Sequence, residues 1–273
     1  MQIWWGYRLG DSLTLIINRI ISVSLTIVGI ILKGSYKKAQ RWRDRYANLG
    51  TTHFPFNITH RLYYTTKFKC WFDGQAIIWT PDYPESWLQK FRPGSVGIDV
   101  GAHRGYFSLT FGRRYAGNIK IIAIEPESNN FLALLKNISF NKAFWITPLP
   151  FAIWNRKCSL SVIHGREVSF GSFTHVLKES DDGEIMGYPL DYIYEILSLS
   201  RVDWIKIDVE GAEIKILEGA QKLLSICKPD IWMEFHLPFH EIEEALARVG
   251  YVVKARRDFR ENFGALWAVP LVT

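Results

Sequence analysis

From about residue 95 to residue 270, short apolar runs alternate with longer stretches in which apolar residues recur every three or four positions. The short runs predict buried strands, and the longer stretches predict amphipathic helices. The predicted strands cover residues 95–100, 119–125, 143–153, 202–208, 229–236, 251–256 and 264–270. The predicted helices cover residues 105–116, 128–141, 192–199, 211–225 and 239–250.

This alternation predicts an α/β fold, in which a Rossmann-like, doubly wound parallel sheet has helices on both faces. No helix separates the last two strands, so we expect them to form an antiparallel hairpin at one edge of the sheet. Residues 154–200 interrupt the alternation with short strands and turns. We expect three parts: a hydrophobic and basic helical segment at 1–48, a small β-rich cap at 49–94, and the α/β domain at 95–273.

The N-terminal segment contains a long apolar stretch. Residues 13–32 include thirteen Leu, Ile or Val and a single charged residue, Arg19. As a helix this stretch is about 30 Å long, which matches the hydrocarbon core of a bilayer. Its polar and small residues share one arc of the helix: Asn18, Arg19, Ser22, Thr26 and Gly29. Three arrangements stay open: a helix that spans the membrane, one that lies in its interface, or one that packs in a soluble assembly.

Positive charge is concentrated around this apolar stretch. Residues 1–70 carry eleven Lys and Arg against two Asp, a net charge of +9, whereas 22 basic and 25 acidic residues leave −3 for residues 71–273. An enzyme that acts on nucleic acid typically has positive charge around its cleft. The net negative charge of residues 71–273 therefore disfavours nucleic acid as a partner. Residues 13–45 instead suit an anionic membrane surface. The basic cluster follows the apolar run. If this run spans a membrane, the positive-inside rule predicts a membrane-associated protein whose following residues all face the cytoplasm.

Two further observations agree with a cytoplasmic location. Cys70, Cys158 and Cys227 show neither CxxC spacing nor a histidine at metal-ligand spacing, so we expect reduced thiols. No small-residue cleavage site follows the apolar run, so we expect no cleaved signal peptide.

The first candidate binding element is the turn in VGIDVGAHRGYFSL. A strand ends near Asp99, Gly101 lies in the turn, and Gly105 opens the next helix. Glycine lets the backbone approach a ligand closely, and the helix N-terminus presents N–H groups to it. The DxGxxxG spacing, with His103 in its middle, differs from the GxGxxG of dinucleotide sites and suits a nucleoside ligand without phosphate. An ordinary strand–helix turn is the alternative.

The second candidate element is Glu125, which ends the next predicted strand in IIAIEP. It lies 26 residues after Asp99, where an acidic side chain typically binds the ribose hydroxyls of a nucleoside. Loop and acid together predict a nucleoside-cofactor site, in which Ala102 and Pro126 are further candidate contacts.

Three motifs, in this order, resemble the FkbM-type S-adenosylmethionine-dependent methyltransferases: GIDVGAHRGYFSL, AIEPESNNFLALLKN and LDYIYEILSLSRVDWIKIDVEGAEIKILEGA. IWMEFH continues the likeness, which covers about residues 70–250, and KIDVEGAE is its most specific block. The resemblance implies a seven-stranded sheet whose last pair is antiparallel, S-adenosylmethionine as cofactor, and methylation of a hydroxyl, typically on a sugar or natural product.

The resemblance also implies roles for individual residues. Asp99, Gly101 and Gly105 are expected to frame the methionine part of the cofactor, and Glu125 to bind its ribose. His103 stands where many relatives carry asparagine, which leaves that polar contact open.

The charged tip of strand 202–208 provides the candidate catalytic residues. In an open α/β sheet, ligands bind beyond the carboxyl ends of the strands, and a hydroxyl acceptor needs a group that takes its proton. We expect Asp208 and Glu210 to position or deprotonate the acceptor, with His236 as the alternative base. Lys206 is expected to be a counter-ion or a clamp on an anionic acceptor. A solvated acidic cluster at a helix N-terminus is the structural alternative, and no third ligand supports a metal site.

The leading hypothesis is therefore an S-adenosylmethionine-dependent O-methyltransferase that acts on a glycan, a lipid-linked saccharide or another small molecule at the membrane surface. A membrane-attached binding module with a non-catalytic methyltransferase fold and a methyltransferase of nucleic acid are the alternatives. A nicotinamide-dependent oxidoreductase is disfavoured by the DxGxxxG spacing and the terminal hairpin.

The membrane hypothesis is testable by sedimentation. The full chain should pellet with vesicles of anionic lipid, because residues 13–45 combine apolar and basic side chains. A truncated chain that begins at Gly50 should stay in the supernatant. If both proteins stay soluble, residues 13–45 do not bind membranes.

Overall fold

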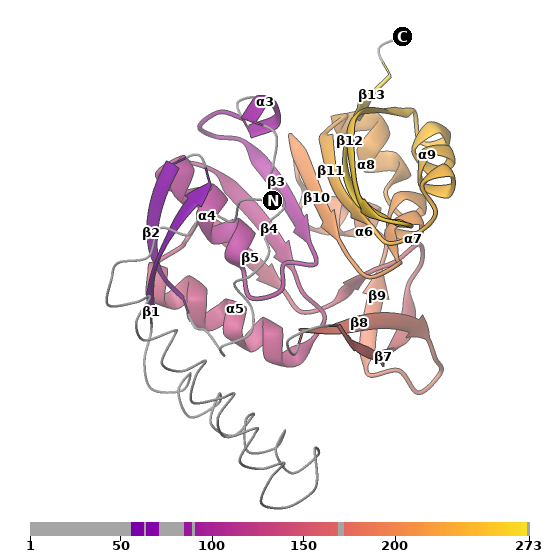
Figure 1. The fold of residues 1–273 in the computed structure, drawn as a ribbon, viewed down its shortest axis with the longest axis horizontal. Helices are drawn as coiled ribbons and strands as arrows, with labels where there is room; N and C mark the ends of the chain where they lie inside the picture. The colour runs from indigo at the N-terminus through magenta and orange to yellow at the C-terminus, as the bar shows by residue number, and fades with distance from the viewer. Residues whose placement is uncertain (1–55, 63, 71–84, 89–90, 169–171, 272–273) are drawn as a thin grey trace, which may run out of the picture. The chain divides into compact units, whose positions relative to one another are not determined.

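The computed structural model describes residues 56–62, 64–70, 85–88, 91–168 and 172–271 (Figure 1). The predicted apolar helix at 13–32 and its basic flank lie outside the described residues. Within the described part of the chain, no helix is both long and apolar enough to cross a membrane.

The chain divides into two units, of which the first covers Met1–Asp82 together with Ser139–Asn141. In it, β1 (Phe56–Leu62) and β2 (Tyr64–Cys70) pair as an antiparallel hairpin, from Phe56 opposite Cys70 to Leu62 opposite Tyr64. The second unit begins at Tyr83 and includes the short helix α3 (Glu85–Leu88), which precedes the boundary predicted at residue 95.

The second unit contains a seven-stranded sheet with the order β12-β13-β11-β10-β3-β4-β5 (Figure 1). Its strands are β3 (Val96–Val100), β4 (Lys120–Ile124), β5 (Ile146–Leu149), β10 (Trp204–Asp208), β11 (Asp230–Phe235), β12 (Tyr251–Arg260) and β13 (Phe263–Pro270). The first five are parallel, whereas β13 is antiparallel to both β11 and β12. The predicted α/β fold with its antiparallel terminal hairpin is confirmed, and the last strand lies between β11 and β12.

The described residues include six further helices after α3. One prediction about these helices was wrong. They are α4 (Tyr106–Arg114), α5 (Ser128–Asn141), α6 (Leu190–Ile196), α7 (Glu213–Glu218), α8 (Gln221–Cys227) and α9 (Phe239–Arg248). The single helix expected at 211–225 is two helices, because α7 ends before Gly219. A Cβ at Gly219 would lie 2.2 Å from the backbone oxygen of Trp154, so the helix breaks where its backbone packs against another segment.

The sheet has a different core on each face. On one face, aliphatic residues such as Ile205 and Ile207 pack against α6, α7, α8 and α9. On the other face, Trp204 contacts four aromatic rings at centroid distances of 4.9 to 6.4 Å: Trp87, Phe91, Phe107 and Phe111. Gly97 on the neighbouring strand makes room for this indole, since a Cβ there would lie 1.9 Å from the Trp204 ring. Because side chains alternate along β10, Lys206 shares the aromatic face with Trp204.

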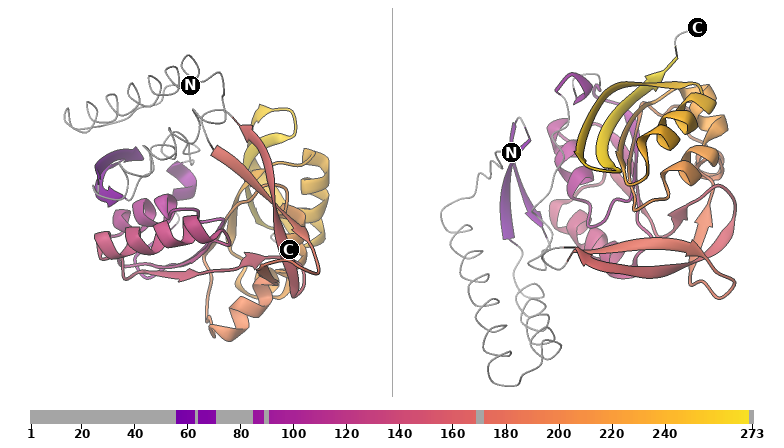
Figure 2. Two further views of the ribbon diagram at one scale, coloured as in Figure 1. Left: turned by 90° about the horizontal axis from the view of Figure 1, so that it is seen from below. Right: turned by 45° about the vertical axis from the view of Figure 1, so that its right-hand side comes forward.

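A second, four-stranded sheet occupies the region where the sequence predicted short strands. Its order is β6-β9-β7-β8, with β6 (Ala152–Ile153), β7 (Cys158–Val168), β8 (Ser172–Glu179) and β9 (Ile185–Tyr188). Trp154 and Leu160 pack in one cluster with Ala212, which follows the tip of β10. The small sheet therefore lies beyond the carboxyl ends of the parallel strands, beside the predicted site (Figure 1, Figure 2).

Candidate active site

The glycine loop after β3 packs directly against the tip of β10. A Cβ on Gly101 would lie 2.0 Å from the backbone oxygen of Asp208, and the φ angle of Gly101 is 77°. The amides of Gly101 and buried Ala102 donate to the carbonyl oxygen of Ile124 at 3.0 and 2.9 Å. The ends of β3, β4 and β10 are thereby held together, and only glycine fits at position 101.

A buried ion pair lies beneath this loop. Lys206 Nζ is 3.2 Å from Asp99 Oδ1, 3.1 Å from Asp208 Oδ2 and 3.3 Å from the backbone oxygen of Gly101. Asp99 is fully buried, and its other carboxylate oxygen accepts a hydrogen bond from Ser108 Oγ at 2.7 Å. Contacts with two carboxylates agree with the counter-ion role, one of the two roles predicted for Lys206. The Lys206 side chain is only 5% exposed.

Glu125 joins the loops that follow β3 and β4. Its carboxylate accepts hydrogen bonds from the backbone N–H groups of His103 at 2.8 Å and Glu127 at 2.9 Å. Burial raises the pKa of Glu125 to about 7, and the two backbone hydrogen bonds oppose that rise. A carboxylate oxygen that accepts one hydrogen bond retains a second lone pair, so Glu125 can still accept from ligand hydroxyls. His103 is exposed, and Pro126 is half-buried.

The glycine that opens α4 is fixed by packing. Gly105 has a φ of 80°, and a Cβ there would lie 2.4 Å from Leu134 Cδ1. No side chain caps this helix N-terminus. A helix N-terminus carries partial positive charge, which suits an anionic group such as a carboxylate.

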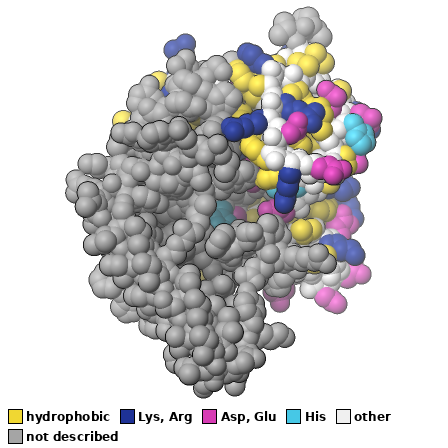
Figure 3. Space-filling model, viewed as in Figure 1, with side chains coloured by type: hydrophobic (Ala, Val, Ile, Leu, Met, Phe, Trp, Pro, Cys, Tyr) yellow, Lys and Arg dark blue, Asp and Glu magenta, His cyan; other side chains and the backbone are white. Residues whose placement is uncertain are grey.

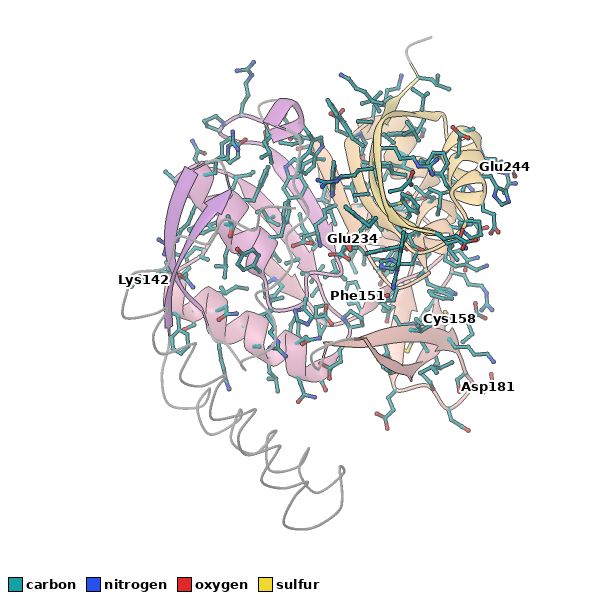
Figure 4. All side chains as sticks on the ribbon, in the orientation of Figure 1. Lys142, Phe151, Cys158, Asp181, Glu234 and Glu244 are labelled. Atoms are coloured by element: carbon teal, nitrogen blue, oxygen red, sulfur yellow. The ribbon has the colours of Figure 1, made fainter. Side chains whose placement is uncertain are left out.

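Glu234 on β11 is a site residue that the sequence interpretation missed. It pairs in register with Asp208, is 4% exposed, and its Oε2 has no hydrogen-bond partner among the described residues (Figure 4). Burial and the charge of Asp208 raise the pKa of Glu234 to about 9, against the lowering effect of Lys206. Glu234 is therefore protonated at neutral pH. The signal in the sequence was an acidic residue inside the apolar run IWMEF.

His236 lies between two further carboxylates. Its Nδ1 is 3.0 Å from Glu213 Oε1, and its Nε2 is 3.5 Å from Glu210 Oε2. The same Glu213 oxygen also accepts the backbone N–H of His236 at 2.9 Å. Burial lowers the pKa of His236, but the hydrogen bond that His236 donates to Glu213 and the nearby charges of Glu210, Glu213 and Asp208 outweigh it, so the net shift is upward. The ring is oriented through Nδ1 and presents Nε2 as its second functional atom.

The structure thus brings Asp208, Glu210 and His236 to the same edge of the sheet. Burial raises the pKa of Glu210, an effect that the neighbouring His236 opposes. Glu213 is fully buried, and its carboxylate contacts His236 Nδ1. Among the described residues, no three His, Cys, Asp or Glu side chains are arranged to hold a metal ion.

Comparison with known proteins identifies the family of this chain. The sequence model of the Methyltransferase FkbM domain matches residues 99–253, more than half of the chain. The chain belongs to the FkbM methyltransferase family. The resemblance inferred from the three motifs is confirmed, and the FkbM segment runs from the end of β3 into β12.

Three similar proteins share less than a quarter of their aligned residues with this chain. Methyltransferase 1 of Beauveria bassiana (strain ARSEF 2860) is 23% identical over 152 residues, which cover 48% of this chain and 61% of that protein. Methyltransferase FkbM from Methylobacillus flagellatus KT has a TM-score of 0.45 and 22% identity, over 66% of this chain and 44% of that chain. A SAM-dependent methyltransferase from Aquifex aeolicus has a TM-score of 0.42 and 12% identity, over 68% and 89% of the two chains. The chain spans less than two thirds of the first two proteins.

The protonation of Glu234 predicts a pH-dependent stability. Its pKa is about 9 in the folded protein against an ordinary value of 4.5. Between these pH values the folded state holds a proton that the unfolded state has released, so stability falls as the pH rises towards 9. Glutamine does not titrate, so the Glu234→Gln variant should not lose this stability. The free energy of unfolding of the variant, relative to that of the unmodified protein, should therefore rise by a few kcal/mol, as an order of magnitude, between pH 4.5 and 9.

Chemical denaturation at a series of pH values measures this difference. The control is Glu244→Gln, at an exposed position of α9. Parallel stability curves for the Glu234 variant and the unmodified protein would show that Glu234 is ionised in the folded state.

Proposed function

We propose that this chain is an S-adenosylmethionine-dependent O-methyltransferase. The observation that carries the proposal is the convergence of Gly101, Glu125, Asp208 and His236 at one edge of the sheet, held by the loops after β3, β4, β10 and β11. Family membership supports methyl transfer, and the geometry supports a nucleoside site next to a proton acceptor.

The residues at this edge fit the proposed cofactor. The Glu125 carboxylate interacts with two backbone N–H groups and the Asn130 side chain, and it retains acceptor capacity for a ribose hydroxyl. The uncapped N-terminus of α4 suits the α-carboxylate of the methionine part. The carboxylates of Asp208 and Glu210 provide negative potential for a sulfonium cation. When bound, S-adenosylmethionine supplies an electrophilic methyl group.

His236 is the proposed general base. A neutral imidazole whose Nδ1–H donates to Glu213 has its lone pair on Nε2, so it would accept the proton that the acceptor hydroxyl loses on methylation. Glu213 fixes the tautomer and stabilises the imidazolium that results. Asp208 is a weaker candidate, because its carboxylate is already ion-paired with Lys206. It is better placed to orient the acceptor.

The proposed acceptor is a hydroxyl on a glycan, a lipid-linked saccharide or another small molecule. The resemblance of the sequence motifs to FkbM-type enzymes supports this class of substrate. The apolar and basic residues 13–45 support an acceptor at the cytoplasmic face of a membrane. The net charge of −3 over residues 71–273 disfavours nucleic acid.

Cofactor binding is tested with S-adenosylhomocysteine, the product that S-adenosylmethionine becomes when it loses its methyl group. At about 100 times its Kd, it should stabilise the protein by about 2.7 kcal/mol and raise Tm by roughly 5 °C or more. Glu125→Ala should abolish the shift, whereas Glu184→Ala, at an exposed turn, should retain it. NAD should have no effect. Stabilisation by NAD and not by S-adenosylhomocysteine would exclude a methyltransferase.

The role of His236 is tested with labelled S-adenosylmethionine, by measuring methyl transfer into glycolipid, saccharide and RNA fractions. His236→Gln should lower kcat by about 10²- to 10⁴-fold and leave S-adenosylhomocysteine binding unchanged. In the unmodified enzyme the rate should rise with pH as His236 loses its proton, and this rise should disappear in the variant. If Asp208→Asn removes that limb and His236→Gln does not, Asp208 is the base.

A further inference from the structure

The edge strand β12 carries a row of basic side chains that lie on aromatic rings. Their positive groups are 3.5 to 5.7 Å from ring centroids, in the pairs Lys254–Trp267, Arg256–Phe239, Arg257–Phe259 and Arg260–Phe263. Figure 3 shows Lys and Arg side chains among hydrophobic ones over this part of the molecule. Lysine on an edge strand discourages pairing with other chains. Preventing such pairing does not by itself require each cationic group to pack on an aromatic ring.

The last of these residues, Arg260, lies at the same edge of the sheet as the candidate active site. Strand β12 is antiparallel to β13, which is antiparallel to β11, so β12 runs in the direction of β11 and ends where β11 ends. The strand register is irregular between Asp258 and Arg260. Such bulges redirect side chains and are common beside active sites.

Phe263 connects Arg260 to the proposed base. The His236 ring lies 4.8 Å from the Phe263 ring, and the Arg260 guanidinium lies 4.9 Å from that same ring. Burial raises the pKa of Glu210, and the nearby charge of Arg260 counteracts that rise. Among the described side chains, no carboxylate forms an ion pair with Arg260, whereas Arg256 pairs with Asp258 at 2.7 Å.

We propose that Arg260 binds a phosphate group of the acceptor and thereby selects phosphorylated acceptors for methylation. This rests on the proposed function. The carboxylates around His236 repel an anionic acceptor, so a phosphate near the reacting hydroxyl needs a cation at the rim of the site. A guanidinium binds phosphate oxygens in a bidentate manner, and its packing on Phe263 reduces the rotamer freedom lost on binding.

Binding is measured on the full chain by NMR, from the His236 imidazole signals. The probes are glucose 6-phosphate, a soluble short-chain phosphatidylglycerol, and glucose as the uncharged comparison. We expect saturable shifts with a phosphate probe and none with glucose at the same concentrations. Arg260→Gln should weaken binding at least about tenfold, and Arg260→Lys should weaken it less, because it keeps the charge and loses the planar fork. Arg248→Gln, an exposed arginine on α9, should bind as the unmodified protein does.

Each outcome decides the proposal. Stronger binding of glucose 6-phosphate indicates a phosphorylated saccharide, and stronger binding of the lipid probe indicates a lipid phosphate headgroup. Equal binding of glucose and glucose 6-phosphate, or an unchanged Kd in Arg260→Gln, overturns it. No cofactor is needed for this measurement, so its failure is distinct from a failure of S-adenosylhomocysteine to bind.

Discussion

The candidate site depends on one buried ammonium group. Lys206 Nζ contacts Asp99 on β3, Asp208 at the end of β10 and the backbone oxygen of Gly101 in the loop that follows β3. A buried charge is stable only when it is paired, so these partners must stay together in the folded protein. Gly101 also packs closely on the Asp208 backbone. Lys206 therefore links the proposed cofactor loop to Asp208, a proposed acceptor residue.

The environment of each carboxylate at this edge assigns it a different task. Asp208 is ion-paired with Lys206, whereas Glu234, its neighbour in register, is buried with a pKa of about 9 and keeps its proton. Glu213 is buried against His236, and Glu210 is partly exposed on the other side of that ring. Acidic groups this close are not all ionised together, because like charges in a low-dielectric site repel each other. A protonated Glu234 next to Asp208 lowers the net charge that the site presents to an acceptor.

Much of the fold could be predicted from the sequence, and the exceptions have a common physical cause. Apolar periodicity located the strands and most helices, since it follows directly from burial of one face. The break between α7 and α8 was missed because the Gly219 backbone packs on Trp154, far away in sequence. Glu234 was missed because its proximity to Asp208 exists only after β10 and β11 pair.

Lys206 and His236 could be predicted as site residues from the sequence. Whether each side chain faces solvent or a carboxylate depends on tertiary contacts, which the sequence pattern does not show. The membrane role of residues 13–45 stays a prediction.

Family membership and acceptor choice depend on different parts of the chain. The FkbM match covers residues 99–253, which contain the glycine loop, Glu125 and the residues around His236. Arg260 and Phe263 follow this segment, so membership of the family does not specify them. Phe263 nevertheless contacts the His236 ring, which means that the terminal hairpin supplies one wall beside the proposed base. A change in this hairpin can therefore alter the acceptor while the residues proposed to bind the cofactor and to take the proton remain in place.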